Sequence, residues 1–175
     1  MTTPEQRAAF CLVCGTSLEA REIFGRRRRA CPACNFIVFE STACAAGAVV
    51  VRGREVLLVR RAIDPGKGRW GFPAGFQDYG ESLTETAVRE VREETGLGVD
   101  PVRLLDVVLS RDNPRKLVNL VVYLARVVAG ELVAADDALE ARFFPVDDLP
   151  EDLAFENNRQ ILDRLVRETP TGDFL

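Results

Sequence analysis

The chain has 175 residues, of which 47% are hydrophobic, so it can bury the core of one medium-sized domain with a small appendage. Its 23 Lys and Arg against 27 Asp and Glu give a net charge of −4, which disfavours a chain that coats nucleic acid. Histidine is absent. Ser-His and Cys-His pairs and histidine-bound metals are therefore excluded, and catalysis must use carboxylates, metals, Arg, Lys or Tyr.

The segment up to Arg7 is polar, and no apolar run is long enough to span a bilayer. We therefore expect a cytoplasmic protein without a membrane partner. In a reducing cytoplasm, cysteines stay thiols or thiolates rather than forming disulfides.

Two Cys-x-x-Cys pairs stand near the N-terminus: Cys11 with Cys14, and Cys31 with Cys34. Their separation predicts a zinc ribbon of four thiolates over residues 1–40, with a hairpin joining two knuckles. Gly15 follows the first pair, where a tight turn favours glycine. So small a unit needs the metal for its stability. The alternatives are four buried thiols or two oxidised pairs.

Four consecutive arginines, Arg26–Arg29, lie within this ribbon. One interpretation is a patch that binds phosphate or nucleic acid. The other is a solvated hairpin edge, which we favour because no aromatic residues alternate with the arginines for base stacking.

Apolar runs bounded by turn residues predict the strands of one sheet. The first two, at 44–51 and 55–59, form a hairpin around Gly53, and Cys44 in the first is expected in the core. Further strands are expected at 102–110, 117–128 and 141–146, with a continuation of the sheet at 131–133. Loops are expected at 63–70, 111–116 and 136–140, and a helix at 155–167. This order predicts an α/β fold in which a mixed sheet lies between helices.

A second helix is expected over residues 83–95. Ser82 and Glu85 have the spacing of a capping box that starts a helix, and Gly96 is placed to end it. Ala87 and Val91 fall on its apolar face.

Three glutamates of this helix, Glu90, Glu93 and Glu94, fall at the border of the apolar face, given about 100° of rotation per residue. Arg89 is among the residues expected to point away. Like charges clustered at the edge of a core repel one another unless a cation neutralises them. The pattern therefore predicts a divalent-metal site, and the alternative is a Glu/Arg-rich surface helix.

Gly75, Glu81 and the run Arg89-Glu90-Val91-Arg92-Glu93-Glu94-Thr95-Gly96-Leu97 resemble the Nudix box at every defined position. The resemblance covers about residues 43–168. With the four cysteines ahead of it, the chain resembles zinc-ribbon Nudix hydrolases of the ADP-ribose, FAD and NADH pyrophosphatase group. The resemblance implies a Nudix-type α/β/α sandwich. It also implies an enzyme that uses Mg²⁺ or Mn²⁺ to hydrolyse a nucleoside diphosphate linked to another moiety X. Metals must neutralise the anionic pyrophosphate before water can attack it.

The resemblance also implies roles for single residues. Glu90, Glu93 and Glu94 would bind the metal, assisted by the backbone carbonyl of Gly75. Glu81 would support the site. Arg89 would hold the glutamates in place by ion pairing.

An acidic residue on a later loop would supply a further ligand or the general base. Asp137 and Glu140 are the candidates, and the alternative for both is loop solvation. The candidate substrate-binding residues are Arg60, Trp70, Phe72 and Tyr79. The three aromatic ones could stack on a base, although structural packing is the favoured interpretation for each.

Weaker features predict the substrate. No SQPWPFPxS-like stretch, typical of the zinc-ribbon NADH pyrophosphatases, occurs between Val99 and Val128. The FPAGF run at 72–76, the LPEDLAF run at 149–155 and Pro114 favour ADP-ribose or FAD, with AMP and X-phosphate as products. The alternatives are an NADH or RNA-cap pyrophosphohydrolase, or a nucleotide-sensing module whose ribbon binds RNA or protein. A homodimer is expected by analogy only, and a nucleic-acid partner is not.

Overall fold

The structure is a computed structural model that describes residues 8–112, 116–170 and 174. The expectation placed on Pro114 lies outside these residues. The chain divides into two compact units, Met1–Ser41 and Thr42–Leu175, and each is described by itself. No helix in the described part of the chain is long and apolar enough to cross a membrane.

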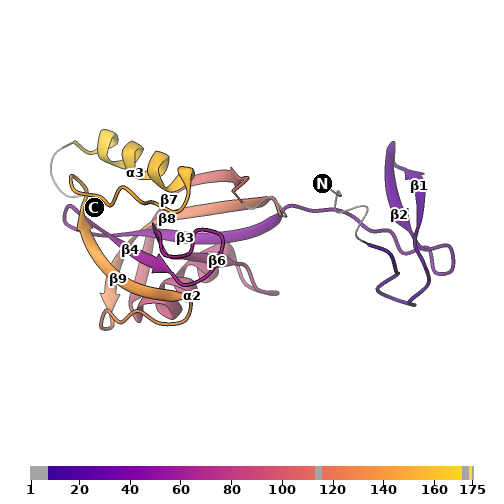
Figure 1. Cartoon of the computed structure of the whole chain (residues 1–175), viewed down its shortest axis with the longest axis horizontal. Coiled ribbons are helices and arrows are strands. Elements are labelled where there is room, and N and C mark those ends of the chain that lie inside the picture. Colours follow the sequence, from indigo (N-terminus) through magenta and orange to yellow (C-terminus); the bar gives the residue numbers. More distant parts are fainter. Residues whose placement is uncertain (1–7, 113–115, 171–173, 175) are drawn as a thin grey trace. The chain divides into compact units, whose positions relative to one another are not determined.

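The first unit contains a β-hairpin (Figure 1), and in the chain one Cys-x-x-Cys pair precedes this hairpin and the other follows it. Its strands, β1 (Glu19–Ile23) and β2 (Arg26–Ala30), pair antiparallel. Phe24 and Gly25 form the turn with φ of 52° and 69°, the left-handed backbone that a two-residue hairpin turn requires. Gly15 has φ of 73°, which confirms the tight turn expected after the first knuckle.

The arginine run lies on β2 of this two-stranded sheet. Its first two members are exposed. Arg28 lies 4.9 Å from the centroid of the Phe39 ring, and Arg29 donates to the Ala8 carbonyl. The run thus lies on a hairpin with its first two members solvated, as the favoured interpretation predicts, whereas Arg28 and Arg29 take part in packing within the ribbon.

The second unit contains a mixed sheet with strand order β5-β4-β3-β8-β7, in which β6 also pairs with β3 and β9 with β4. β3 and β8 run parallel. β3 is buried over most of its length, as expected for a central strand that is covered on both faces. The strands are β3 (Ala43–Arg52), β4 (Glu55–Arg61), β5 (Trp70–Gly71), β6 (Ala74–Phe76), β7 (Gly98–Ser110), β8 (Val118–Ala129) and β9 (Ala138–Pro145).

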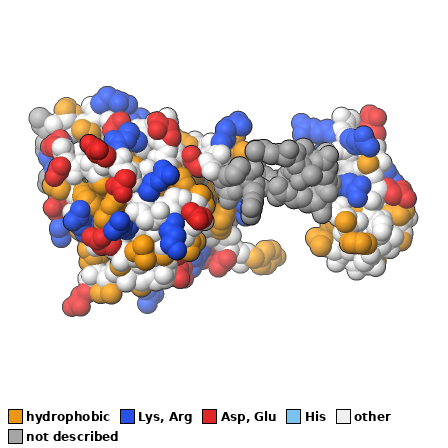
Figure 2. Space-filling model, in the orientation of Figure 1, with side chains coloured by type: hydrophobic (Ala, Val, Ile, Leu, Met, Phe, Trp, Pro, Cys, Tyr) orange, Lys and Arg blue, Asp and Glu red, His pale blue; other side chains and the backbone are white. Residues whose placement is uncertain are grey.

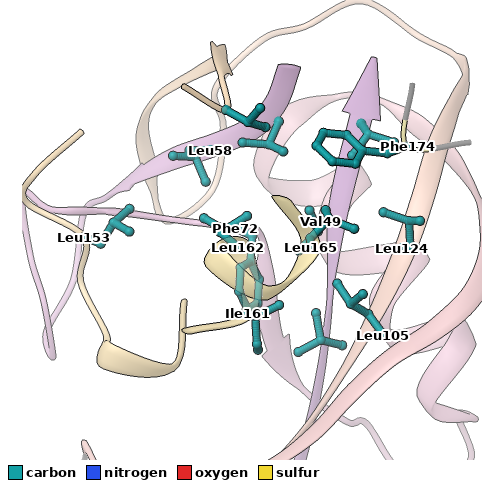
Figure 3. Close-up of a cluster of buried hydrophobic side chains, with 14 of the residues drawn as sticks. Val49, Leu58, Phe72, Leu105, Leu124, Leu153, Ile161, Leu162, Leu165 and Phe174 are labelled. Carbon is teal, nitrogen blue, oxygen red and sulfur yellow. The ribbon is translucent and has the colours of Figure 1, made fainter. Parts of the chain in front are cut away.

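Neighbouring residues of β3 belong to different apolar layers, because side chains alternate across a strand. Val49 packs in a cluster with Leu162 of the C-terminal helix (Figure 3). Val50 packs in another cluster with Val91 of the glutamate-bearing helix. These helices are α3 (Glu156–Glu168) and α2 (Leu83–Thr95). They cover opposite faces of the sheet (Figure 1), which confirms the predicted α/β/α sandwich.

Helix α2 begins and ends where the sequence predicts. Ser82 accepts from the Glu85 backbone, and the Glu85 side chain accepts from the Ser82 backbone, so the capping box is complete. Gly96 adopts φ of 71° and donates to the Arg92 carbonyl.

Three expectations about local structure are wrong. Residues 131–133 do not continue the sheet, because the backbone N–H of Val133 donates to the carbonyl of Thr95 at the end of α2. The acidic loop is shorter than expected: β9 begins at Ala138, so Glu140 lies on a strand paired with β4. Cys44 is exposed rather than in the core, although it lies on β3 as expected.

Candidate active site

Helix α2 places two carboxylates inside the protein. Glu90 and Glu94 lie one turn apart and are only 8% and 2% exposed, whereas Glu93 is exposed. Both face β6: Glu94 accepts from the backbone N–H of Ala74, and a Cβ on Gly75 would overlap the Glu90 carboxylate. Glycine at position 75 is therefore what lets the strand approach this carboxylate.

Arg89 holds the glutamates of this site together. Its guanidinium donates to both carboxylate oxygens of Glu81, at 2.7 and 3.0 Å, and to Glu90 and Glu93 at 2.7 and 2.9 Å. It also donates to the Phe76 carbonyl. Helical phase predicted that Arg89 points away, and this is wrong because the long side chain folds back across the acidic border. The ion pairing that the resemblance implied is what the structure shows.

Glu81 is the most strongly held of these carboxylates. Besides Arg89, the Thr86 hydroxyl and the Asp78 backbone donate to it. These bonds, with Arg89 first, lower the pKa of Glu81 to about 2. Glu81 thus stays ionised, and its charge balances the guanidinium.

Glu94 is compensated much less, because the Ala74 N–H and the charge of Arg61 do not outweigh its burial. Its Oε2 is buried without a hydrogen-bond partner. Burial, followed by repulsion from Asp137 and Glu90, raises the pKa of Glu94 to about 9. Burial also raises the pKa of Glu90. Paired acidic groups of this kind with an unused oxygen suit a hard divalent cation, which would remove both the repulsion and the desolvation penalty.

In this structure the carboxylate oxygens of the described residues do not surround one point that a metal ion could occupy. Among the described acidic and cysteine side chains, only the four ribbon cysteines bring their ligand atoms within 4.8 Å of one another. Glu90 and Glu93 are both turned toward Arg89. A cation shared by all three glutamates therefore requires Glu93 to turn away from Arg89, and Glu93 is exposed enough to do so.

The two candidates for a further acidic residue lie in different surroundings. Asp137 is close enough to repel the charges of both Glu90 and Glu94. Glu140 instead lies 3.9 Å from Arg60 on the neighbouring strand. Of the two, the structure brings only Asp137 toward the buried glutamates.

A pocket of about 220 Å³ opens beside these carboxylates, and Gly75 belongs to its wall. Its lining is largely apolar and aromatic, with a few polar groups. The principal residues are Arg61, Ile63, Phe72, Phe76, Phe155, Asn157 and Asn158. The pocket and the acidic cluster therefore meet at one strand, β6, whose Gly75 lines the pocket and also lies against Glu90.

The four residues predicted to bind substrate lie in different surroundings. Phe72 is buried and also lines the pocket. Trp70 is buried against Phe144, with ring centroids 4.8 Å apart, as the packing interpretation predicted. Tyr79 is fully exposed, so the packing interpretation is wrong for it. Arg60 is not among the residues that line the pocket; it donates to the Gly68 carbonyl.

Its neighbour Arg61 is a pocket residue that the sequence did not reveal. Arg61 lines the pocket, donates to the Pro65 carbonyl and lies over the Phe155 ring. Its positive charge also acts on Glu94. A shift of register between Arg60 and Arg61 breaks the strand alternation at this point, so sequence pattern could not tell which arginine faces the pocket.

The four cysteines of the first unit converge. The sulfurs of Cys11 and Cys34, Cys14 and Cys31, and Cys14 and Cys34 lie 3.5–3.6 Å apart. A disulfide needs about 2.0 Å, whereas four thiolates about 2.3 Å from one zinc ion lie some 3.8 Å apart. All four are free cysteines. The cluster fits a zinc ribbon and does not fit two oxidised pairs.

Comparison with known proteins agrees with this geometry. A NUDIX domain model matches residues 42–165. The chain is 41% identical over 122 residues to an ADP-ribose pyrophosphatase of Methanocaldococcus jannaschii, covering 69% of this chain and 72% of the relative. It is 35% identical over 144 residues to the NAD-capped RNA hydrolase NudC of Pseudomonas aeruginosa. That match covers 81% of this chain but spans about half, 49%, of the relative.

The fold has similar solved structures as well. A NUDIX hydrolase from Nitrosomonas europaea superposes with a TM-score of 0.83 at 29% identity, over 92% of each chain. An ADP-ribose pyrophosphatase from Streptococcus suis superposes with a TM-score of 0.58 at 28% identity, over 73% of this chain and 93% of that one. With the matched domain covering most of its length and the acidic helix in place, this chain belongs to the Nudix hydrolase family.

Proposed function

We propose that this chain hydrolyses the pyrophosphate bond of an ADP-linked nucleotide, with ADP-ribose or FAD favoured, to give AMP and X-phosphate. The observation that carries the proposal is the buried, unpartnered oxygen of Glu94 beside Glu90 and Asp137, an arrangement that calls for a cation. The similarity to an ADP-ribose pyrophosphatase supports the choice of substrate.

The metal in this proposal is Mg²⁺ or Mn²⁺. Glu90, Glu93 and Glu94 would hold it, with the Gly75 carbonyl as a further ligand. When bound, the metal supplies charge neutralisation for the pyrophosphate and activation of water. Such ions prefer a few carboxylates together with waters and substrate phosphates, which suits the pairing of this acidic helix with an adjacent pocket.

The remaining residues prepare the site. Arg89 and Glu81 form an ion pair that positions the neighbouring carboxylates. Asp137 is the general base in this proposal, because it lies near both buried glutamates, and accepts the proton of the attacking water. Glu140 is left as a structural partner of Arg60.

Zinc is proposed for the ribbon. Among the residues that the structure describes in that unit, the hydrophobic cluster has Cys11, Leu18 and Cys31 as its buried members, with a few partly buried residues against them, which is too little to stabilise a fold without a metal. Cysteines that form no disulfide agree with a reducing compartment, and we propose a cytoplasmic location. We also propose that the chain forms a homodimer.

Hydrolysis of a nucleotide cap on RNA is the second candidate, favoured by the similarity to NudC proteins. The chemistry would be the same, and only the leaving group would differ. On the face that Figure 2 shows, Lys and Arg alternate with Asp and Glu over the second unit, without a broad basic surface for a phosphate backbone. The small-molecule substrate therefore ranks first.

Replacing Glu93 tests the reaction. Glu93→Gln should lower kcat for ADP-ribose with Mg²⁺ by roughly 10²- to 10³-fold, because a metal ligand is lost. The matched control is Glu131→Gln, an exposed glutamate outside the site, which should behave as wild type. Wild-type turnover by the Glu93 variant would rule out the metal-ligand assignment. No turnover of any ADP-linked substrate by the wild type would rule out the proposed function.

Replacing Glu94 tests the electrostatics of the site without metal. Since its pKa is raised from 4.5 to about 9, the folded chain keeps a proton that the unfolded chain loses. Metal-free stability should therefore fall as the pH rises from 4.5 toward 9. Glu94→Gln removes this titration and should stabilise the metal-free chain by roughly 1–3 kcal/mol at pH 7. Urea unfolding of the metal-free wild type and variant at pH 5, 7 and 8.5 measures this difference in stability. A difference between the two chains that does not change with pH would contradict the raised pKa of Glu94.

Metal analysis tests the ribbon. Purified protein should contain about one zinc per chain, and Cys31→Ser should lose it and become sensitive to protease within residues 8–41. Cys44→Ser is the control, because this thiol lies outside the cluster, and it should keep its zinc. A ribbon that resists protease equally with and without metal would show that the cysteines are only packed thiols.

A further inference from the structure

The hairpin of the ribbon carries unlike charge on its two faces. Side chains alternate across a strand, so Arg26 and Arg28 of β2 lie on one face together with Arg21 of β1, the cross-strand partner of Arg28. On the other face, Arg27 is directly opposite Glu22, a pair of opposite charge. The positive charge of the hairpin is therefore concentrated on the first face.

Two arginines of that face oppose each other. The Cβ atoms of direct cross-strand partners such as Arg21 and Arg28 lie about 5 Å apart, and like charges at this distance are destabilising. Arg26 adds a third guanidinium about 7 Å along the strand. Glu19 lies 3.3 Å from Arg21, but both side chains are exposed and the pair is screened by water. Among the described residues, neither Arg26 nor Arg28 forms an ion pair. An anionic partner would relieve this repulsion.

An aromatic ring lies on the same face. The backbone N–H of Val38 donates to the Arg29 carbonyl, which sets the segment after the second cysteine pair beside β2. Phe39 thereby lies next to Arg28, whose guanidinium is 4.9 Å from the centroid of the ring, and Phe39 is 57% exposed. A guanidinium plane and an exposed aromatic ring are both surfaces on which a nucleobase stacks. The ring that the arginine run lacks in the sequence is thus supplied by the fold.

The opposite face of the hairpin packs within the unit. Val38 packs against the cluster that contains Cys11 and Cys31, and Arg29 donates to the Ala8 carbonyl. The described residues therefore leave the face of Arg21, Arg26, Arg28 and Phe39, here called the arginine face, toward solvent. Residues 1–41 contain six Arg and four Glu, so this unit is basic although the chain as a whole is acidic.

We propose that the arginine face binds a single-stranded nucleic acid, with the arginines on its phosphates and a base stacked on Arg28 and Phe39. Positive charges with a flat ring beside them match the phosphates and bases of a single strand, whereas a duplex keeps its base faces stacked inside. The net charge of the chain disfavoured such a partner because it averages a basic unit with a larger acidic one. The inference goes beyond the proposed function, since it concerns the ribbon and not the acidic helix.

Fluorescence anisotropy of the full chain with a labelled oligouridine RNA tests the arginines. The double variant Arg21→Ala, Arg26→Ala should bind this RNA about tenfold more weakly or worse. A plot of log affinity against log salt should also lose about 1.4 of its slope, because each phosphate contact to a single strand contributes about 0.7. The matched control is Arg27→Ala, an exposed arginine of the same run on the opposite face, which should bind as wild type does. An equal loss in this control, or no RNA binding by the wild type at low salt, would overturn the proposal.

Replacing the ring tests the stacking. Phe39→Leu keeps an apolar side chain but removes the aromatic ring, and it should weaken RNA binding roughly 5- to 100-fold. Its binding to inorganic polyphosphate, which has the charge without the bases, should be unchanged. Leu12→Ala is the control for an exposed apolar side chain of the ribbon, and should bind RNA as wild type does. Polyphosphate bound by the wild type as tightly as RNA would show a surface for anions in general and would overturn the proposal.

Vesicles that contain phosphatidylglycerol test a membrane as the partner instead. Phe24 at the tip of the hairpin is 80% exposed, which is where a side chain that inserts into lipid would lie. The chain should stay in solution when such vesicles are sedimented. Sedimentation with the vesicles, combined with no RNA binding, would overturn the proposal in favour of a lipid surface.

The outcomes separate this inference from the proposed function. RNA binding is measured without Mg²⁺ or Mn²⁺, and Glu93→Gln should bind RNA as wild type does. If ADP-ribose is hydrolysed and RNA is not bound, the arginine face is wrong and the function stands. If RNA is bound through the arginine face but no ADP-linked substrate is hydrolysed, the inference stands and the proposed function fails.

Discussion

The burial of negative charge on one face of α2 is the constraint on which the rest of the structure depends. Glu90 and Glu94 are taken out of water beside Asp137, and the guanidinium of Arg89, which donates to Glu90, leaves Glu94 without an ion-pair partner among the described residues. An unpaired buried charge is costly, so Glu94 keeps a proton in the metal-free chain, and a carboxyl group in such surroundings persists where function requires it. The scaffold serves this arrangement: a capping box fixes the start of the helix, and Gly75 lets β6 approach the carboxylates.

The same strand links chemistry to recognition. Gly75 of β6 lies against the Glu90 carboxylate and also lines the apolar pocket, so the fold would set the distance between a reacting phosphate and the rest of its nucleotide. The ribbon forms a separate compact unit with its own cysteine cluster. Its stability is expected to depend on metal, whereas the larger unit depends on apolar layers on both faces of the sheet.

Local signals made much of this predictable from sequence. The cap at Ser82, the stop at Gly96 and the cysteine spacing each depend on residues close together in the chain, and the structure agrees with them. The failures depend on tertiary contacts. The backbone of Val133 bonds to the end of α2 rather than to a strand. A register shift determines that Arg61, and not Arg60, lines the pocket. Asn158 lines the pocket only because α3 packs beside it.

The central claim is that the carboxylates of α2 form one divalent-cation site. Titration of the chain with Mn²⁺, followed by electron paramagnetic resonance, counts bound ions directly and needs no substrate. The account predicts a Mn²⁺ site from which Mg²⁺ displaces the bound Mn²⁺. This site should be absent from the double variant Glu90→Gln, Glu94→Gln. A double variant of the exposed Glu131 and Glu151 should retain it. Unchanged Mn²⁺ binding after loss of both buried glutamates would contradict the account.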